Sequence, residues 1–229
     1  MDDVSFELAP VVELIAELRW GPPGITLGAD GSQSLTLSMG RETEEFFLRF
    51  GAAVAGFGYT QAEKLVPPGF PAILHQVVWR FRKPGDASSL LQVGLGLFSA
   101  NALQPYRRWR DFRPTVVAGV NALLATRIGQ EREQQFSQVS LRYMNAFSEP
   151  LLAGKSPAEF MRDVLCLKLE LPEAIAKLVG PAANVSSTSN VLLPVANTSK
   201  VMSAAFGDGS VNSAPAAIYD VTLADNNVA

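Results

Sequence analysis

Residues 90–114 read LLQVGLGLFSANALQPYRRWRDFRP, and this segment decides the expected fold. Its first part alternates apolar side chains with glutamine and glycine, which predicts one β-strand over residues 90–99. An aromatic and arginine-rich turn follows, and apolar residues then recur at helical spacing over residues 109–128. The segment therefore predicts a strand that leads through a turn into a helix.

Further elements are predicted around this segment. Period-two alternation predicts strands over residues 11–20, 73–81 and 136–147, and helical spacing predicts an amphipathic helix over residues 38–57. The run KPGDASS at 83–89 is interpreted as a hairpin loop before the strand at 90–99. The order strand, helix, strand, strand, helix, strand is that of the ferredoxin-like βαββαβ fold, in which two helices cover one face of an antiparallel sheet. We therefore expect an α+β protein with this core.

Short helices and a β meander are predicted after the core. Ser156, Pro157 and Glu159 resemble a capped helix start, and this helix is expected to end near Leu167. A second short helix is expected over residues 172–179, and weakly alternating runs at 185–195, 200–206 and 216–223 predict the meander. The expected domains are a ferredoxin-like domain at 1–150, a short helical linker at 151–183 and a C-terminal β meander at 184–229.

The composition excludes several classes of protein. A chain of 229 residues with 48% hydrophobic content buries a substantial core, so a disordered protein is excluded. A formal net charge of -3 argues against a generic nucleic-acid binder, whose footprint is usually strongly basic. One cysteine, Cys166, and one histidine, His75, exclude an internal disulfide and an ordinary zinc site of Cys and His ligands. We expect neither a metal nor a cofactor.

The N-terminus and the hydropathy pattern bear on localisation. The first residues, MDDVSFELAP, are acidic where a secretory signal would be basic. No uninterrupted apolar run approaches the roughly 18 residues that a membrane-spanning helix needs. We therefore expect a cytoplasmic protein without membrane contact.

Four arginines and three aromatic residues lie within eight positions, at 106–113. Arginine binds phosphate and carboxylate groups bidentately, aromatic rings stack on bases, and a helix start adds partial positive charge. In the opposing interpretation, Trp109 and Phe112 anchor the helix to the core while the arginines lie in solvent, and protein contact is a third possibility. The ligand-binding candidates are Arg80, Arg82, Tyr106, Arg107, Arg108, Trp109, Arg110 and Arg113.

Arg80 and Arg82 join the candidates through strand alternation. If their face coincides with that of Gln92, Gly94 and Gly96, the glycines leave bare backbone beside two guanidinium groups. Such glycines mark either the close approach of a ligand or a bulge in the strand.

No catalytic residue is predicted. His75 falls on an apolar face of the predicted strand at 73–81, which favours a core or half-buried residue over a catalytic base. Without His75, serine or cysteine nucleophiles have no histidine base to use. Cys166 follows valine and leucine and is expected to be a small core residue.

Four motifs resemble a sporadically distributed prokaryotic protein family of unknown function. They are PVVELIAELRW at 10–20, LLQVGLGLFSAN at 90–101, the Tyr106, Trp109, Phe112 and Pro114 pattern, and LRYMN at 141–145. Because this family has no assigned activity, cofactor or catalytic residues, the resemblance implies none here. It implies a helix after Leu223, so we expect the meander to be truncated. The polar or aromatic positions that match are Glu13, Arg19, Gln92, Asn101, Tyr106, Trp109, Arg142, Tyr143 and Asn145.

The sequence favours a non-enzymatic binding or regulatory module. Its arginine and aromatic surface at 80–113 is expected to engage an anionic ligand or a partner protein. One alternative is an enzyme that acts on a phosphorylated or nucleic-acid substrate. Another is a structural subunit of a homo-oligomer that is completed by its C-terminal strands.

Overall fold

The computed structural model describes residues 9–21, 25–27, 33–35, 41–67, 69–70, 72–106, 108–167, 173, 177–178 and 188–228. Contacts between residues divide the chain into two compact units. The α1–α2 unit comprises Leu14–Leu141 with Ala224–Ala229, and the α4 unit comprises Met1–Glu13 with Arg142–Leu223. Each unit is described by itself below.

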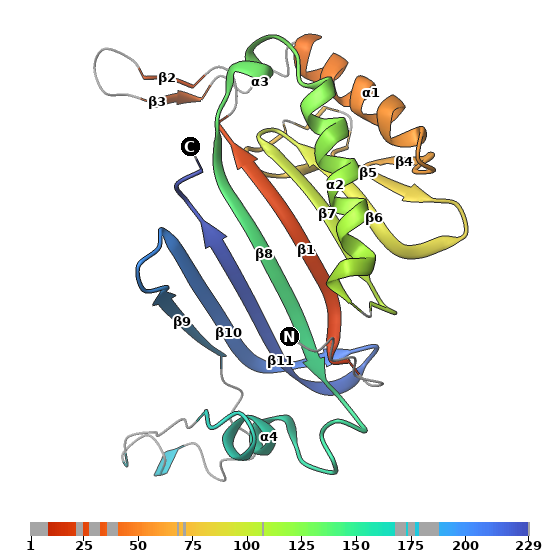
Figure 1. Cartoon of the computed structure of the whole chain (residues 1–229). Helices are drawn as coiled ribbons and strands as arrows, with labels where there is room; N and C mark the ends of the chain where they lie inside the picture. Colours follow the sequence, from red (N-terminus) through yellow and green to blue (C-terminus); the bar gives the residue numbers. More distant parts are fainter. Residues whose placement is uncertain are drawn as a thin grey trace. The chain divides into compact units, whose positions relative to one another are not determined.

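The described strands form a large sheet with the order β4-β5-β6-β7-β1-β8-β11-β10-β9 (Figure 1). Its strands are β1 (Val11–Trp20), β4 (Gln61–Lys64), β5 (Val77–Lys83), β6 (Asp86–Gly94), β7 (Leu97–Leu103), β8 (Phe136–Phe147), β9 (Thr188–Pro194), β10 (Lys200–Val211) and β11 (Ala214–Asp225). A separate antiparallel pair consists of β2 (Ile25–Leu27) and β3 (Gln33–Leu35). The pairings β4–β5, β5–β6, β6–β7 and β9–β10 are antiparallel. The protein is therefore α+β, as the sequence predicted.

The ferredoxin-like topology is wrong, because the predicted strand at 90–99 is in fact a hairpin. β6 ends at Gly94, Leu95 and Gly96 form the turn, and β7 begins at Leu97. Gly96 has a φ of 65°, and a Cβ there would lie 2.4 Å from the carbonyl oxygen of Trp20. A turn of two residues does not interrupt the alternation of apolar positions. The sequence pattern of the two strands therefore looks like that of one continuous strand. β4 also adds a strand that its polar sequence did not signal.

The predicted strand at 73–81 begins only at Val77, since residues 73–76 form a turn. His75 has a φ of 57° in this turn and is half-buried. Its backbone N–H donates to the carbonyl of Leu95 at 2.9 Å, and its Nε2 lies 3.2 Å from the carbonyl oxygen of Trp20. His75 therefore lies in a turn, where it contacts the carbonyl groups of Leu95 and Trp20. It does not lie on an apolar strand face.

Two helices cover one face of the sheet in the α1–α2 unit, as predicted (Figure 1). They are α1 (Arg41–Ala55) and α2 (Trp109–Thr126), and the short helix α3 (Gly129–Glu133) follows. The ring of Phe50 on α1 packs edge-on against Phe81 of β5 and Phe98 of β7. Gly119 brings α2 close to β7, since a Cβ there would lie 2.7 Å from the ring of Phe98. Aromatic packing and this close approach fix both helices on the sheet.

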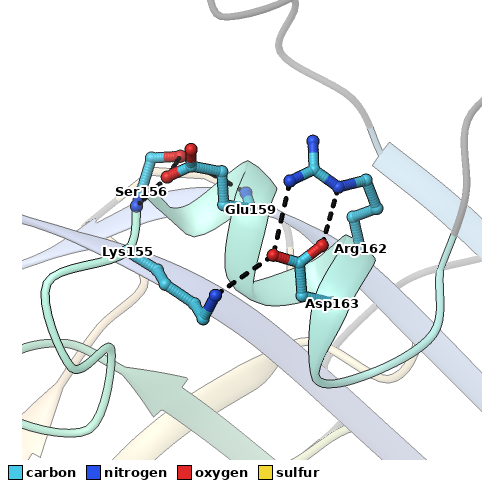
Figure 2. A network of polar contacts seen from close by, with 5 residues as sticks. All are labelled: Lys155, Ser156, Glu159, Arg162 and Asp163. Atoms are coloured by element: carbon cyan, nitrogen blue, oxygen red, sulfur yellow. Dashed lines mark hydrogen bonds and ion pairs between the residues drawn. The ribbon is translucent and has the colours of Figure 1, made fainter.

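The α4 unit has its own core. Helix α4 (Pro157–Asp163) begins with the predicted capping box, in which Ser156 and Glu159 bond to each other's backbone N–H (Figure 2). Phe160 and Met161 of α4 pack with Leu152 and Ala217, against partly buried residues that include Phe206 of β10. The helix ends at Asp163, before the predicted end at Leu167. Cys166 is exposed and has a φ of 57°, so the prediction of a core residue is wrong.

The remaining predicted elements match in part. β8 has the predicted bounds, and β9, β10 and β11 correspond to the three runs of the predicted meander. Most of the predicted helix at 172–179 lies outside the described residues, apart from positions 173 and 177–178.

Candidate functional site

A cleft of about 330 Å³ lies in the α1–α2 unit, beside the start of α2. It is lined by Lys83, Asp86, Ser88, Ser89, Ala102, Leu103, Pro105, Tyr106, Arg108, Asp111, Phe112 and Thr115. The register explains how these residues meet. Ser89 pairs with Ala102, so the first residues of β6 lie beside the last residues of β7. Since the chain enters α2 soon after β7, the β5–β6 hairpin and the helix start together enclose the cleft.

Two cations line the cleft. The Nζ of Lys83 lies 5.0 Å from the ring centroid of Tyr59, which gives the ammonium a cation–π contact. Arg108 is the N-cap of α2, with an extended backbone, and its own side chain makes no capping hydrogen bond. The N-terminal end of a helix carries a partial positive charge. The start of the 18-residue helix α2 therefore adds to the positive charge of Lys83 and Arg108. The lining therefore offers positive charge to a negative group.

Two carboxylates line the same cleft. Oδ1 of Asp86 accepts hydrogen bonds from the backbone N–H and the hydroxyl of Ser88, at 2.9 and 2.5 Å. These bonds, helped by the positive charge of Lys83, hold the pKa of Asp86 below its ordinary value. Asp111 lies 3.7 Å from Nε of Arg108 and 3.9 Å from Nε of Arg110. The lining thus combines two cations with two carboxylates.

Hydroxyl groups complete the polar lining. The hydroxyls of Tyr59 and Ser89 lie 2.7 Å apart in a buried hydrogen bond, which fixes the wall formed by β6. Ser88, Thr115 and Tyr106 also line the cleft. A ligand in this cleft therefore meets charged groups of both signs together with neutral hydrogen-bonding groups.

The predicted candidates of the arginine cluster divide between the cleft and the outside of α2. Tyr106 and Arg108 line the cleft. Arg110 and Arg113 are exposed on α2 and are not part of the lining. Trp109 is 38% exposed and packs edge-on against the buried Phe112, with 6.1 Å between the ring centroids. Arg107 lies outside the described residues.

Arg80 and Arg82 lie on the other face of the sheet. Phe81, between them, packs against Phe50 of α1, and side chains alternate between the faces of a strand. Arg80 is paired in register with Gln92, so the two polar faces coincide. Nη1 of Arg80 donates to Oε2 of Glu63 at 3.3 Å. The structure does not bring these two arginines to the cleft.

Gln92 and Asn101 belong to a buried polar network. The hydroxyl of Ser99 lies 3.2 Å from Oε1 of Gln92 and 2.8 Å from Oδ1 of Asn101. All three residues are buried, and Gln92 and Ser99 are register partners on β6 and β7. The contact between Ser99 and Gln92 ties the two strands of the hairpin together, whereas that between Ser99 and Asn101 lies within β7. At Gly94 the neighbouring backbone approaches closely, since a Cβ there would lie 1.8 Å from the carbonyl oxygen of Gln76.

The other positions of the family pattern lie outside the cleft lining. Arg19 donates from Nε to Glu17 at 2.6 Å, and Glu13 is half-buried on β1. Arg142 is paired with Asp220. The remaining two are on β8, where Tyr143 is half-buried and Asn145 donates from Nδ2 to the carbonyl of Tyr219 at 3.0 Å.

Sequence reasoning missed six polar residues of the cleft. They are Lys83, Asp86, Ser88, Ser89, Asp111 and Thr115. The first four belong to the run KPGDASS, which was interpreted as a loop. The missed signal was the turn at Leu95 and Gly96, because that turn pairs the start of β6 with the end of β7 and so places the run beside α2.

Within the described ranges, no group of three or more His, Cys, Asp or Glu residues could hold a metal ion. No helix in the described part of the chain is long and apolar enough to cross a membrane. No known family model matches the chain, and the search of curated proteins found no match. The resemblance drawn from the four motifs therefore remains a prediction.

Proposed function

We propose that this protein is a non-enzymatic binding module that holds a small ligand with an anionic group in the cleft beside α2. The observation that carries the proposal is that Lys83 and Arg108 line one cleft together with Tyr106, at the start of helix α2.

The anionic group would bind at the start of α2. A guanidinium binds phosphate or carboxylate through paired N–H groups, and Arg108 is the residue from which the helix begins. The partial positive charge of the helix start acts in the same direction. Lys83, from the facing hairpin, supplies a second cation.

The carboxylates restrict the rest of the ligand. Asp86 and Asp111 accept hydrogen bonds, so they favour a ligand that carries hydroxyl or amino groups besides its anionic group. A volume of about 330 Å³ is at the small end of the range for ligand sites, roughly 300–1,000 Å³. A cleft with balanced charges also disfavours a polyanion, because successive phosphates would meet the carboxylates.

The cleft supports binding better than catalysis. The lowered pKa of Asp86 makes its carboxylate a weak base, whereas general bases usually have a pKa near the working pH. His75 lies near the carbonyl of Trp20 and is not part of the cleft lining. A cytoplasmic location is part of the proposal, since a chain with a single cysteine needs no oxidising compartment.

Calorimetric titration at low salt tests the proposal. The probes are inorganic phosphate, adenosine monophosphate and citrate, and we expect at least one of them to bind. Arg108→Gln and Lys83→Gln should each weaken binding about tenfold, which corresponds to about 1.4 kcal/mol. Arg113→Gln is the matched control, because it removes the same charge from the exposed side of α2. Absence of binding to every probe, or an equal loss in the control, would reject the proposal.

A further inference from the structure

The two edges of the large sheet differ in how they are protected. β9 and β4 stand at opposite ends of the strand order. An edge strand presents a row of unpaired backbone N–H and C=O groups, and proteins usually guard it with short length or charged side chains. β4 has four residues and includes Glu63 and Lys64, so it carries both kinds of protection.

β9 carries neither of these two kinds of protection, and its one proline stands at its last position, Pro194. Its sequence TSNVLLP spans seven residues without a charge, and every one of them is exposed. Val191, Leu192 and Leu193 are exposed by 38%, 71% and 43%. Leu192 points to one side of the sheet and its two neighbours to the other, because side chains alternate along a strand. Among the strands that the structure describes, β9 is therefore an edge strand with apolar side chains on both sides.

We propose that β9 is a dimerisation edge, on which β9 of a second copy of this chain pairs antiparallel to form a continuous intermolecular sheet. The outer edge of a strand is satisfied by another strand, which supplies alternating donors and acceptors. Twofold symmetry places the segment opposite itself. Because TSNVLLP has no charged side chain, pairing with itself brings no like charges together. A partner strand with charged side chains would form no ion pairs with β9.

The assembly stops at a dimer. A twofold pairing of β9 uses the same edge of both copies and leaves no second β9 edge open. The opposite edge, β4, remains short and charged, so it does not continue the sheet. The proposed pairing does not involve the residues that line the cleft beside α2, because none of them belongs to β9.

Light scattering across protein concentrations tests the assembly. We expect the wild type to shift from monomer to dimer, and Leu192→Lys to raise the dimer dissociation constant at least tenfold. Leu48→Lys is the matched control, because Leu48 lies on α1 and is 70% exposed against 71% for Leu192. The control should dimerise like the wild type.

Hydrogen exchange on the wild type provides a second measurement that needs no variant. The backbone amides of residues 188–193 should exchange more slowly at high protein concentration than at low concentration, because the pairing protects them. A wild type that stays monomeric, or that forms larger assemblies, would overturn the proposal. Equal weakening in Leu48→Lys and Leu192→Lys, or protection that rises outside β9 only, would overturn it as well.

Discussion

Arg142 on β8 holds Asp220 on β11 in a forked ion pair, with Nε 2.8 Å from Oδ1 and Nη2 in contact with Oδ2. The two residues are 78 positions apart, so this contact ties the last strand of the chain to β8. Asp220 is 17% exposed and Arg142 43% exposed, so solvent screens the pair only in part.

Asp220→Asn should destabilise the protein by about 1 kcal/mol, because it removes the charge while keeping the shape of the side chain. Urea unfolding measures the change. Arg142→Gln and the double variant complete a cycle that isolates the pair. Additive effects of the two substitutions would show that the ion pair contributes nothing.

Gly96→Ala should destabilise the β6–β7 hairpin strongly. The φ of 65° and the 2.4 Å approach to the carbonyl of Trp20 both oppose a Cβ. Gly85→Ala is the matched control, since Gly85 has a φ of 72° but no atom within 4 Å of an added Cβ. We expect a loss of about 1 kcal/mol for Gly85→Ala and about 2 kcal/mol more for Gly96→Ala, measured by thermal or urea unfolding. Equal losses would mean that the contact with Trp20 imposes no restraint.

Tyr59→Phe should destabilise the wall of the cleft by about 1 kcal/mol, because it leaves the buried hydroxyl of Ser89 without its bond to Tyr59. The double variant Tyr59→Phe with Ser89→Ala should recover much of this loss, since both polar groups are then removed. Urea unfolding of the three variants measures the effect. A double variant less stable than the sum of the single changes would contradict this account.

Asp163 should titrate at an unusually low pH. Hydrogen bonds from Arg162, which has the larger effect, and from Lys155 lower the pKa of its carboxyl group from 3.8 to about 2 (Figure 2). A folded pKa below the unfolded one stabilises the protein above about pH 3.8, and this contribution is lost as the pH falls toward 2. Carboxyl chemical shifts in NMR spectra report the titration directly.

Lys155→Gln tests the cause of this shift, because it removes one of the two cations that contact Asp163. The pKa of Asp163 should then rise toward 3.8, while the neighbouring capping box of Ser156 and Glu159 stays intact. A wild-type midpoint near 3.8 would show that the exposed network is too mobile to hold the carboxylate charged.

Long periodic segments could be predicted from the sequence. β1 and β8 have the predicted bounds, because uninterrupted alternation over 10 and 12 residues leaves one strand assignment. α1 and α2 were predicted within a few residues, since bulky apolar side chains such as Phe46, Phe50 and Phe112 recur at helical spacing. The capping box of α4 was predicted for the same local reason, as its partners are three residues apart.

Contacts between distant segments could not be predicted. The turn at Leu95 and Gly96 is invisible in the apolar pattern, so the partner strand β7 and its register were missed. Predictions for the cleft were limited in the same way: Tyr106 and Arg108 stood out by composition, whereas Lys83 and Asp86 join them only through strand pairing.

The sequence by itself determined the helices, the long strands and the arginine-rich helix start, because local periodicity and capping depend on neighbours within a few positions. Only the tertiary structure decided which arginines face a cleft. Arg108 lines it, whereas Arg80 lies across the sheet, because the alternation of a paired strand sets the face on which each side chain emerges. The pairing also decided which of the described strands stand at the edges of the sheet, since edge position depends on the whole strand order.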